Sequence, residues 1–423
     1  MITYIKKDQP QYKANLHCHS TVSDGKLTPA ELKEAYKNHG YSILCITDHE
    51  TPCDHTDMTE KDFLMLTGYE AYLRQTEGKH DAYLAEVHIN LFAKDPHNVA
   101  VVNYNPGYCH YVKDEAAREA LVKVGSQEKR EYTVEYINNF VKTARENGYI
   151  CSHNHPVWSM EKAEQVEAYE GFFTMEMCNY SSYTLNRMEY NAPLYDRLLR
   201  SGKRIFCHSA DDNHNKEPFG HPSCDSFGGF AMVMAKDLTY PSVIEALEKG
   251  DFYSSMGPKI LELTFDGDMV HIETEPVEQI TMFTSGKKTL FVAGTEDAPV
   301  TSADFKIPSK TAYVRFDAVD FRNHHFLGDI SSFFIQEIAG IRPNPHLTSP
   351  DEFEIRPILP KTLENASAYV DTRRGRLSCS WQRVGNQISF SISVPAGMNG
   401  KFIFDGQVME LGCGIHHPVF QVK

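Results

Sequence analysis

The 423-residue sequence has no Cys-x-x-Cys pair, no long apolar run and no excess of basic residues. Because its ten cysteines are scattered and several lie within apolar runs, we interpret them as reduced, buried thiols. The apolar stretches fall short of the roughly 18 residues that a transmembrane helix needs. The first residues, MITYIKKDQP, also lack the apolar segment of a signal peptide. Together these absences predict a cytoplasmic protein.

The chain is strongly acidic, with a formal net charge of −15 and an isoelectric point of about 5.7. Phosphate backbones and anionic lipids repel such a protein, so we expect neither nucleic acid nor a membrane as its main partner. No glycine-rich P-loop for phosphate binding is present. For a small anionic substrate, bound metal ions would have to supply the positive charge.

The stretch 12–50 predicts a strand, a helix and a second strand, with metal-capable side chains after each strand. The first apolar run ends at His17 and His19, which share one face of a strand because side chains alternate. A capping-box sequence at residues 28–31 predicts the start of the helix. The second apolar run ends just before His49. In folds of alternating strands and helices, chemistry lies at the carboxyl ends of the strands.

From residue 12 to about 260, apolar strands and helices continue to alternate, which indicates a mostly parallel sheet or barrel. Further metal-capable residues follow or end these strands: Asp24, Glu70, His88, His153 or His155, Asp212 and His214. A set that mixes imidazoles with carboxylates suits Zn²⁺, Mn²⁺ or Fe²⁺ better than Ca²⁺ or Mg²⁺. After residue 260 the period changes to two, which predicts β-sandwich modules, with an aromatic stretch at 322–342 that could be helical.

The order of these motifs resembles the polymerase and histidinol phosphatase (PHP) family over about residues 10–260. The matching residues are His17-Cys18-His19, Asp24, Thr47-Asp48-His49, Glu70, His88, His155-Pro156 and Asp212-Asn213-His214. The resemblance implies an α/β fold, a distorted (β/α)7 barrel that carries up to three metals.

The ligand sets that the resemblance implies overlap at one carboxylate. One metal would take His17, His19, Glu70 and Asp212; a second would share Glu70 and add His88 and His155; a third would take Asp24, His49 and His214. The family usually has one histidine before the proline, so His153 would either replace His155 or support the ligands. Glu176 and Asn179 also match and would support the ligands.

From two or three divalent transition metals, Zn, Mn or Fe, we predict hydrolysis of a small phosphate ester, because such metals make hydroxide available near neutral pH. The resemblance of the C-terminal region to a sugar enzyme, described below, favours a carbohydrate-related ester. Glu70 would bridge two metals, and His214 or Asp48 would move protons. Weaker candidates for phosphate contacts are Arg74, Lys79, His208 and His221, in loops where barrel ligands would lie. The same chemistry leaves open a non-phosphate ester or amide as the substrate. A glycan-binding protein with purely structural metals is the other alternative.

The last 100 residues resemble the C-terminal region of bacterial α-L-rhamnosidases. The matching segments are 323–331, 338–341, 355–357, 359–360, 366–368, 375–376, 380–381 and 394–397. In those enzymes the catalytic acids lie in a helical barrel that this chain lacks, so the resemblance implies an accessory sandwich. Because alternate positions of a strand must be buried, we expect Trp381 in its core rather than on a sugar-binding face. We therefore expect a PHP-type barrel at 1–259, a small β domain at 260–321 and a rhamnosidase-like module at 322–423. The β modules are also where we expect a homo-oligomer contact.

Overall fold

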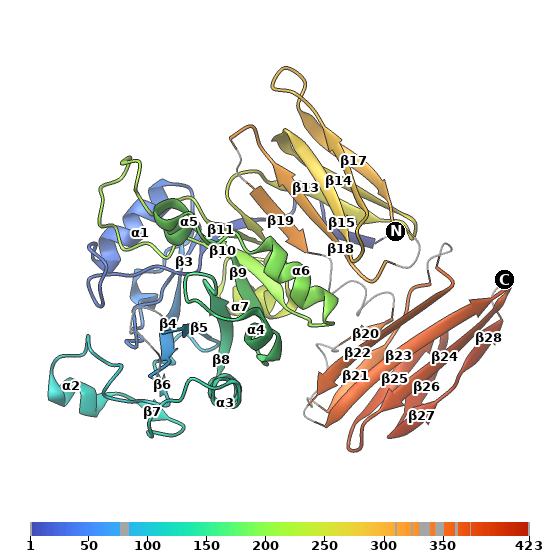
Figure 1. Cartoon of the computed structure of the whole chain (residues 1–423), viewed down its shortest axis with the longest axis horizontal. Helices are drawn as coiled ribbons and strands as arrows, with labels where there is room; N and C mark the ends of the chain where they lie inside the picture. The colour runs from blue at the N-terminus through green and yellow to red at the C-terminus, as the bar shows by residue number, and fades with distance from the viewer. Residues whose placement is uncertain are drawn as a thin grey trace.

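The computed structural model describes residues 2–76, 84–308, 311–322, 325–329, 339–342, 351–359, 363–372 and 374–421. Figure 1 shows three parts: a mixed helix–strand part, a middle strand-rich part and a C-terminal two-sheet part. None of the helices in the described residues is long and apolar enough to cross a membrane. All ten cysteines are unpaired, and seven are buried. The prediction of unpaired thiols is thus confirmed, and the cytoplasmic location stays a prediction.

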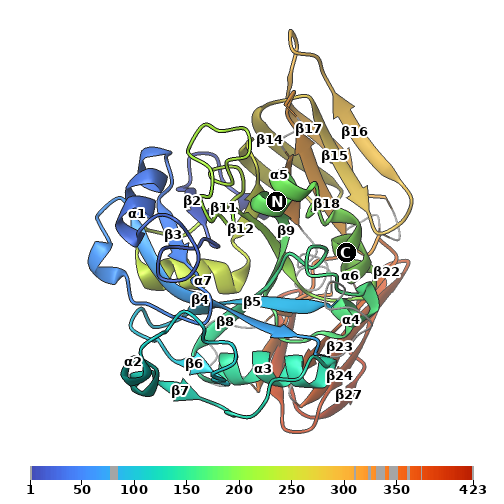
Figure 2. The same cartoon turned by 60° about the vertical axis from the view of Figure 1, so that its left-hand side comes forward.

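The first part is built from alternating strands and helices. Its main elements are β2 (Tyr12–Asn15), α1 (Pro29–Asn38), β3 (Ile43–Ile46), β4 (Leu64–Arg74), β5 (Glu86–Ala93), α3 (Val134–Glu146), β8 (Tyr149–Asn154), α4 (Ala163–Ala168), β9 (Thr174–Asn179), α5 (Tyr180–Asn186), α6 (Ala192–Arg200), β10 (Phe206–Ala210), β11 (Phe230–Val233), α7 (Tyr240–Lys249) and β12 (Phe252–Ser255). Shorter elements are η1 (Thr56–Met58), β6 (Val101–Val102), α2 (Glu115–Ala120) and β7 (Lys123–Val124). Figure 2 shows α1 and α3 on the outside of these strands.

The predicted capping box forms at the start of α1. The amide N–H of Glu31 donates to Thr28 Oγ1 at 3.3 Å, and the amide of Thr28 donates to Glu31 Oε2 at 2.8 Å. These bonds satisfy two of the amides that a helix start leaves open. The strands β3 and β5 are buried along their whole length because elements cover both faces of the sheet. The capping box therefore sets the start of α1, and burial accounts for the wholly apolar strand β3 that follows it.

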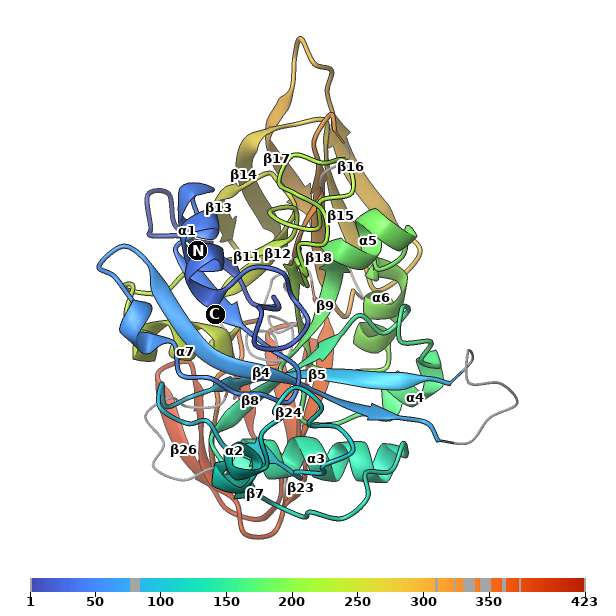
Figure 3. The ribbon, with the colours of Figure 1, turned by 90° about the vertical axis from the view of Figure 1, so that its left-hand side faces the viewer.

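The sheet of the first part runs in the order β10-β9-β8-β5-β4-β3-β2-β11-β12. The pairs β2–β3, β3–β4, β8–β9 and β9–β10 are parallel, whereas β5 and β11 run antiparallel to their neighbours. Figure 3 shows β4 and β5 as a long hairpin. The hydroxyls of Ser209 on β10 and Ser254 on β12 lie 2.6 Å apart, so the sheet nearly closes on itself. The α/β class with a barrel-like sheet is confirmed, and the (β/α)7 count is not.

The middle part extends this sheet and adds a second one. Its strands are β13 (Ile260–Phe265), β14 (Met269–Val277), β15 (Gln279–Thr284), β16 (Thr289–Ala293), β17 (Val300–Lys306), β18 (Val314–Val319) and β19 (His325–Asp329), joined by β1 (Ile2–Ile5). β19 pairs with β12 and β18, and β1 pairs with β13, although the predicted ranges assign β19 to the third unit and β1 to the first. The predicted unit boundaries stay predictions.

The helix considered for 322–342 is wrong for its first part, since β19 is a strand. Antiparallel neighbours on both sides satisfy the backbone of β19, which outweighs any local preference for a helix. Residues 330–338 of that stretch lie outside the described residues.

The C-terminal part is two facing sheets. Its strands are β20 (Ile341–Arg342), β21 (Glu352–Ile355), β22 (Asn365–Thr372), β23 (Gly375–Val384), β24 (Gln387–Val394), β25 (Asn399–Phe404), β26 (Gln407–Leu411), β27 (Gly414–His416) and β28 (Val419–Gln421). Trp381 is 2% exposed, and the rings of Phe390 and Phe402 pack with centroids 4.9 Å apart. The prediction that Trp381 belongs to the core of this sandwich is confirmed.

An ion pair between the buried Arg315 and the partly buried Asp196 joins β18 of the middle part to α6 of the first part. Arg315 Nη2 lies 3.0 Å from Asp196 Oδ2, and the Tyr313 hydroxyl donates to Asp196 Oδ1 at 3.2 Å. The Asp196→Ala variant would leave the Arg315 guanidinium buried without its partner, so we expect about 3 kcal/mol lower stability in urea unfolding. The Asp297→Ala variant, at an exposed turn, should change stability by less than about 0.5 kcal/mol. Equal stability of the two variants would contradict this role of Asp196.

Candidate metal centre

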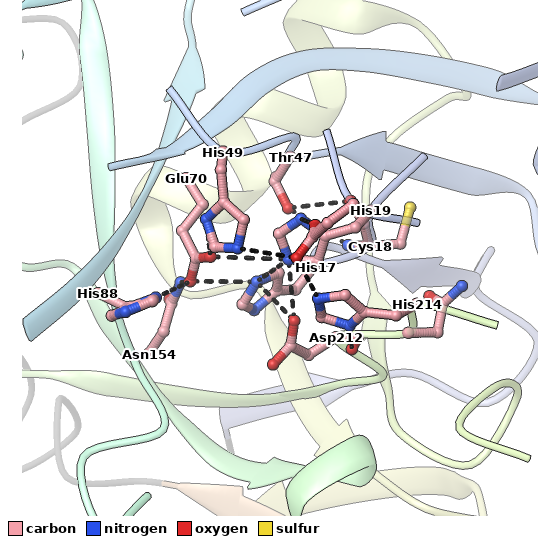
Figure 4. Close-up of polar contacts among 12 residues, drawn as sticks. His17, Cys18, His19, Thr47, His49, Glu70, His88, Asn154, Asp212 and His214 are labelled. Carbon is pink, nitrogen blue, oxygen red and sulfur yellow. Dashed lines mark hydrogen bonds and ion pairs between the residues drawn. The ribbon is translucent and has the colours of Figure 1, made fainter. Parts of the chain in front are cut away.

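Nine side chains converge at one end of the barrel-like sheet. His17 and His19 follow β2, His49 follows β3, and Asp212 follows β10. Glu70 lies within β4, and Figure 4 shows it between His49 and His88. The remaining members are Asp24, His88, His155 and His214. All nine residues that the sequence predicts as metal ligands are therefore brought together.

Glu70 is at the centre of the cluster, 1% exposed. The distances from its two oxygens to imidazole nitrogens are 3.2 Å to His17, 3.1 Å to His88, 3.3 Å to His155, 3.0 Å to His49 and 3.6 Å to His19. Oε1 faces the first three of these histidines and Oε2 faces the other two. One carboxylate thus faces two groups of nitrogens, which is the geometry of a bridging ligand.

The other two carboxylates lie on either side of His19. Asp212 Oδ1 is 2.9 Å from His19 Nε2 and 3.1 Å from His17 Nε2. Asp24 Oδ2 is 3.4 Å from His214 Nε2 and 3.8 Å from His49 Nε2. Each carboxylate therefore completes a group of donors with two or more imidazoles.

Within the cluster, donor atoms gather into four groups, with all atoms of a group within 4.8 Å of one another. The groups are His19-Asp24-His49-His214, His17-His19-Asp212, His17-Glu70-His155 and His49-Glu70-His88. They overlap through shared residues as the family resemblance implies, and they also place His49 beside Glu70. The assignment of each residue to a particular metal stays a prediction.

Several buried atoms of the cluster make no hydrogen bond. They are His19 Nδ1, His49 Nδ1, Glu70 Oε2 and both ring nitrogens of His88. Glu70 faces His49 and His88 at ion-pair distance, but these contacts do not meet hydrogen-bond geometry. A buried polar atom without a hydrogen bond costs about 1–3 kcal/mol, so such a concentration calls for a compensating ligand. Divalent cations fit, because they would accept the lone pairs of these atoms and offset the carboxylate charge.

The carboxylates set the protonation of the histidines around them. Burial favours neutral His88, but Glu70 and Glu86 outweigh it and raise its pKa to about 10. Burial likewise opposes the charge on His214, yet Asp24 and Asp212 raise its pKa to about 9. Burial disfavours the anion of Glu70, but His17, His88 and His49 hold its pKa well below the usual value. The site attracts positive charge strongly.

His19 behaves in the opposite way. Burial and the neighbouring His49 and His214 lower its pKa to about 4, so it is neutral and ready to donate a lone pair at physiological pH.

A second row of residues holds the ligands in place. Glu176 Oε1 lies 2.6 Å from His17 Nδ1, and Glu176 Oε2 accepts the amide of His155 at 2.9 Å. Asn179 donates to both Glu176 and Asp212 at 3.0 Å. These contacts fix the ring of His17 and the carboxylate of Asp212, as metal sites commonly require.

His155, and not His153, lies in the cluster. His153 is the penultimate residue of β8, and its Nε2 lies 2.7 Å from Glu161 Oε1, away from the other ligands. His155 leaves the strand with a positive φ of 25°, which breaks the alternation and turns its ring toward Glu70. Asn154, between them, donates to Glu70 Oε1 at 2.8 Å.

Asp48 serves the loop that carries Asp24. Its carboxylate accepts the amide and hydroxyl of Ser20 at 2.8 and 2.6 Å and the amide of Ser23 at 3.1 Å. With its oxygens engaged in this way, Asp48 positions the loop. His214 is the predicted proton carrier that lies within the cluster.

Three of the weaker candidates for phosphate contacts lie in the described residues, and none of the three joins the cluster. Arg74 Nε is bound to Glu86 at 2.8 Å, and the other oxygen of Glu86 lies 3.5 Å from His88. His208 is fully buried and lies 3.2 Å from Thr174 Oγ1, so a substrate does not reach it. His221 lies in an exposed loop, 3.8 Å from Glu217. Lys79 lies outside the described residues.

Two supporting residues were missed by sequence reasoning. Asn154 carries no signal beyond its place between two histidines. Arg130 forms a buried pair with Glu50, directly after His49, at 2.8 Å. Because the two residues are 80 positions apart, the sequence has no pattern that connects them.

Comparison with known proteins identifies two regions. Residues 15–210 match the family model of the PHP domain, and residues 351–409 match that of the bacterial alpha-L-rhamnosidase C-terminal domain. Both resemblances are confirmed: residues 15–210 are similar to the PHP domain, and residues 351–409 are similar to the C-terminal domain of rhamnosidases.

Individual relatives are distant or match only in part. A 5'-3' exoribonuclease of Haemophilus influenzae is 39% identical over 62 residues, which is 14% of this chain and 23% of the relative. The chain thus spans less than a quarter of the curated relative that it matches. Among solved structures, the chain is similar to a two-domain protein of Bacteroides vulgatus that contains a predicted PHP-like metal-dependent phosphoesterase. The match covers 75% of this chain and 93% of that protein, at 13% identity and a TM-score of 0.36. An alpha-L-rhamnosidase of Streptomyces avermitilis matches 22% of this chain and 11% of its own, at 21% identity and a TM-score of 0.20.

The two neighbouring histidines allow a matched test. His155→Asn should lower the number of metal ions bound per chain, because it removes a nitrogen that faces Glu70. His153→Asn should leave the metal content unchanged, because His153 faces Glu161. Elemental analysis of both variants after loading with Mn²⁺ or Zn²⁺ measures this. Loss of metal from the His153 variant alone would reverse the assignment.

Metal affinity should rise with pH between 6 and 9. The histidines bind metal only when neutral, and carboxylates raise the pKa of His88 to about 10 and of His214 to about 9, so protons compete with the metal. Competition with a fluorescent zinc indicator at three pH values measures the apparent affinity. An affinity that does not change with pH would show that these histidines do not bind the metal.

Proposed function

We propose that the chain is a metal-dependent phosphoric ester hydrolase that acts on a small phosphorylated molecule. The observation that carries the proposal is the set of four overlapping donor groups around the buried carboxylate of Glu70. Within the described residues, Asp24, Glu70 and Asp212 form ion pairs with histidines only. Positive charge for an anionic substrate would therefore come from metal ions, two or three of Zn, Mn or Fe.

Bound divalent metals would supply hydroxide near neutral pH and neutralise the oxygens of the phosphate. The residues of the chain do the rest. Glu70 holds two donor groups at a fixed spacing, because its two oxygens face different histidines. Glu176 and Asn179 keep His17 and Asp212 in one orientation. His214, next to Asp24 at the more exposed side of the cluster, is the residue that we assign to proton transfer.

The partners follow from charge. Because the net charge is −15, we propose a small molecule as the partner, and neither nucleic acid nor a membrane.

For the homo-oligomer contact, we propose the C-terminal sandwich, where Val408, Met409 and Ile415 are exposed. Light scattering of the full chain, and of a Val408→Lys variant, tests this contact; a monomer at micromolar concentration would contradict it.

Glu70→Gln should reduce hydrolysis of p-nitrophenyl phosphate to background while the circular dichroism spectrum stays unchanged. The substitution keeps the shape of the side chain and removes the charge that two donor groups share. Glu410→Gln is the matched control, because Glu410 is an exposed carboxylate that pairs with Lys401 in the C-terminal sandwich. Full activity in the Glu70 variant would exclude Glu70 from the mechanism.

The reaction class has its own test. The metal-loaded protein should hydrolyse p-nitrophenyl phosphate faster than p-nitrophenyl acetate, measured as kcat/KM under the same conditions. Preference for the acetate would favour the non-phosphate ester or amide as substrate.

A further inference from the structure

The loop 156–161, directly after His155, has a well-fixed backbone. Three hydrogen bonds of 3.0–3.1 Å join amides and carbonyls of residues 155–161. The amide of Trp158 donates to the buried carboxylate of Glu189, which also accepts the side-chain amide of Asn191. These bonds fix the backbone of the loop and with it the direction in which Trp158 leaves the chain.

This fixed loop nevertheless exposes large apolar side chains. Val157 is 48% exposed, Trp158 40% and Met160 47%. Met188, next to the Glu189 that anchors the loop, is 44% exposed. Because apolar surface in water is unfavourable, a cluster of this kind on a rigid backbone marks a surface that a ligand covers.

The position of Trp158 indicates what kind of ligand covers this surface. Its ring meets the rings of His155 and His88 edge-on, with centroids 5.1 and 5.7 Å apart. Both histidines belong to donor groups that contain Glu70. The exposed indole therefore stands beside the place where the phosphate would bind.

Further rings flank the same donor groups. Tyr111 stacks on His49 with centroids 6.1 Å apart, and Tyr72 stacks on His88 at 5.4 Å. The nearby cation Arg74 is bound to Glu86. The part of a substrate beyond its phosphate would thus meet aromatic and apolar surfaces more than charge.

We propose that the substrate is a phosphate monoester of an uncharged, ring-bearing alcohol, such as an aryl alcohol or a sugar, whose ring packs on Trp158. This inference rests on the proposed phosphoesterase function and specifies its substrate class. Trp158 is then a specificity-determining residue, and Glu189 positions it through the backbone.

The two tryptophans of the chain make binding directly visible. Trp158 is exposed beside the donor groups, whereas Trp381 is 2% exposed in the C-terminal sandwich. Benzylphosphonate, which is not hydrolysed, should change the emission of the metal-loaded protein in a saturable way, and Trp158→Phe should lose this change. Ethylphosphonate, measured by displacement of benzylphosphonate, should bind about tenfold more weakly. Equal affinities, or an emission change that persists in Trp158→Phe, would overturn the proposal.

Turnover provides a second, independent readout. The ratio of kcat/KM for benzyl phosphate to that for ethyl phosphate should be about ten, since a ring contact of this kind is worth roughly one factor of ten. Trp158→Ala should bring the ratio close to one, and Trp158→Phe should keep most of it. Phe291→Ala is the matched control, because Phe291 is a 63% exposed aromatic residue on β16.

The two proposals fail in different ways. If neither ester is hydrolysed, the phosphoesterase function fails, and the phosphonate titration alone decides whether Trp158 binds a ring. If both esters are hydrolysed and Trp158→Ala leaves their ratio unchanged, the function stands and the ring-bearing substrate is excluded.

Discussion

The carboxylate of Glu70, withdrawn from water among imidazoles, is the constraint on which the site depends. A buried carboxylate is stable only with positive charge or hydrogen-bond donors close to it. Five imidazoles lie within 3.6 Å of its oxygens, and Asn154 donates to it. Because these side chains come from different strands or from the loops after them, the strands must bring their ends to the same side of the sheet. The nearly closed sheet provides that arrangement, and bound cations would complete the balance of charge.

One backbone feature links the chemistry to the choice of substrate. At the end of β8 the positive φ of His155 turns its ring toward Glu70. The same turn starts the loop that carries Trp158 beside the rings of His88 and His155. Glu176 accepts the amide of His155 and holds His17 as well. The turn after β8 therefore positions both the candidate metal ligand His155 and the aromatic side chain of Trp158.

Much of this was predictable where the signal is local. The i, i+2 spacing of His17 and His19 and the capping box at residues 28–31 depend on strand and helix periods, which the sequence carries directly. The direction of β5 and the pairing of β19 depend on long-range contacts, and the sequence carries no direct signal for those. The choice between His153 and His155 depends on one dihedral angle. Arg130 and Asn154 support ligands through contacts without any sequence pattern.

Anomalous X-ray diffraction from crystals of the Mn²⁺- or Zn²⁺-loaded protein tests the central claim most directly. The account predicts two or three peaks inside the four donor groups, with Glu70 contacting at least two of the ions. Ions elsewhere on the surface, or a Glu70 carboxylate that contacts no ion, would contradict it.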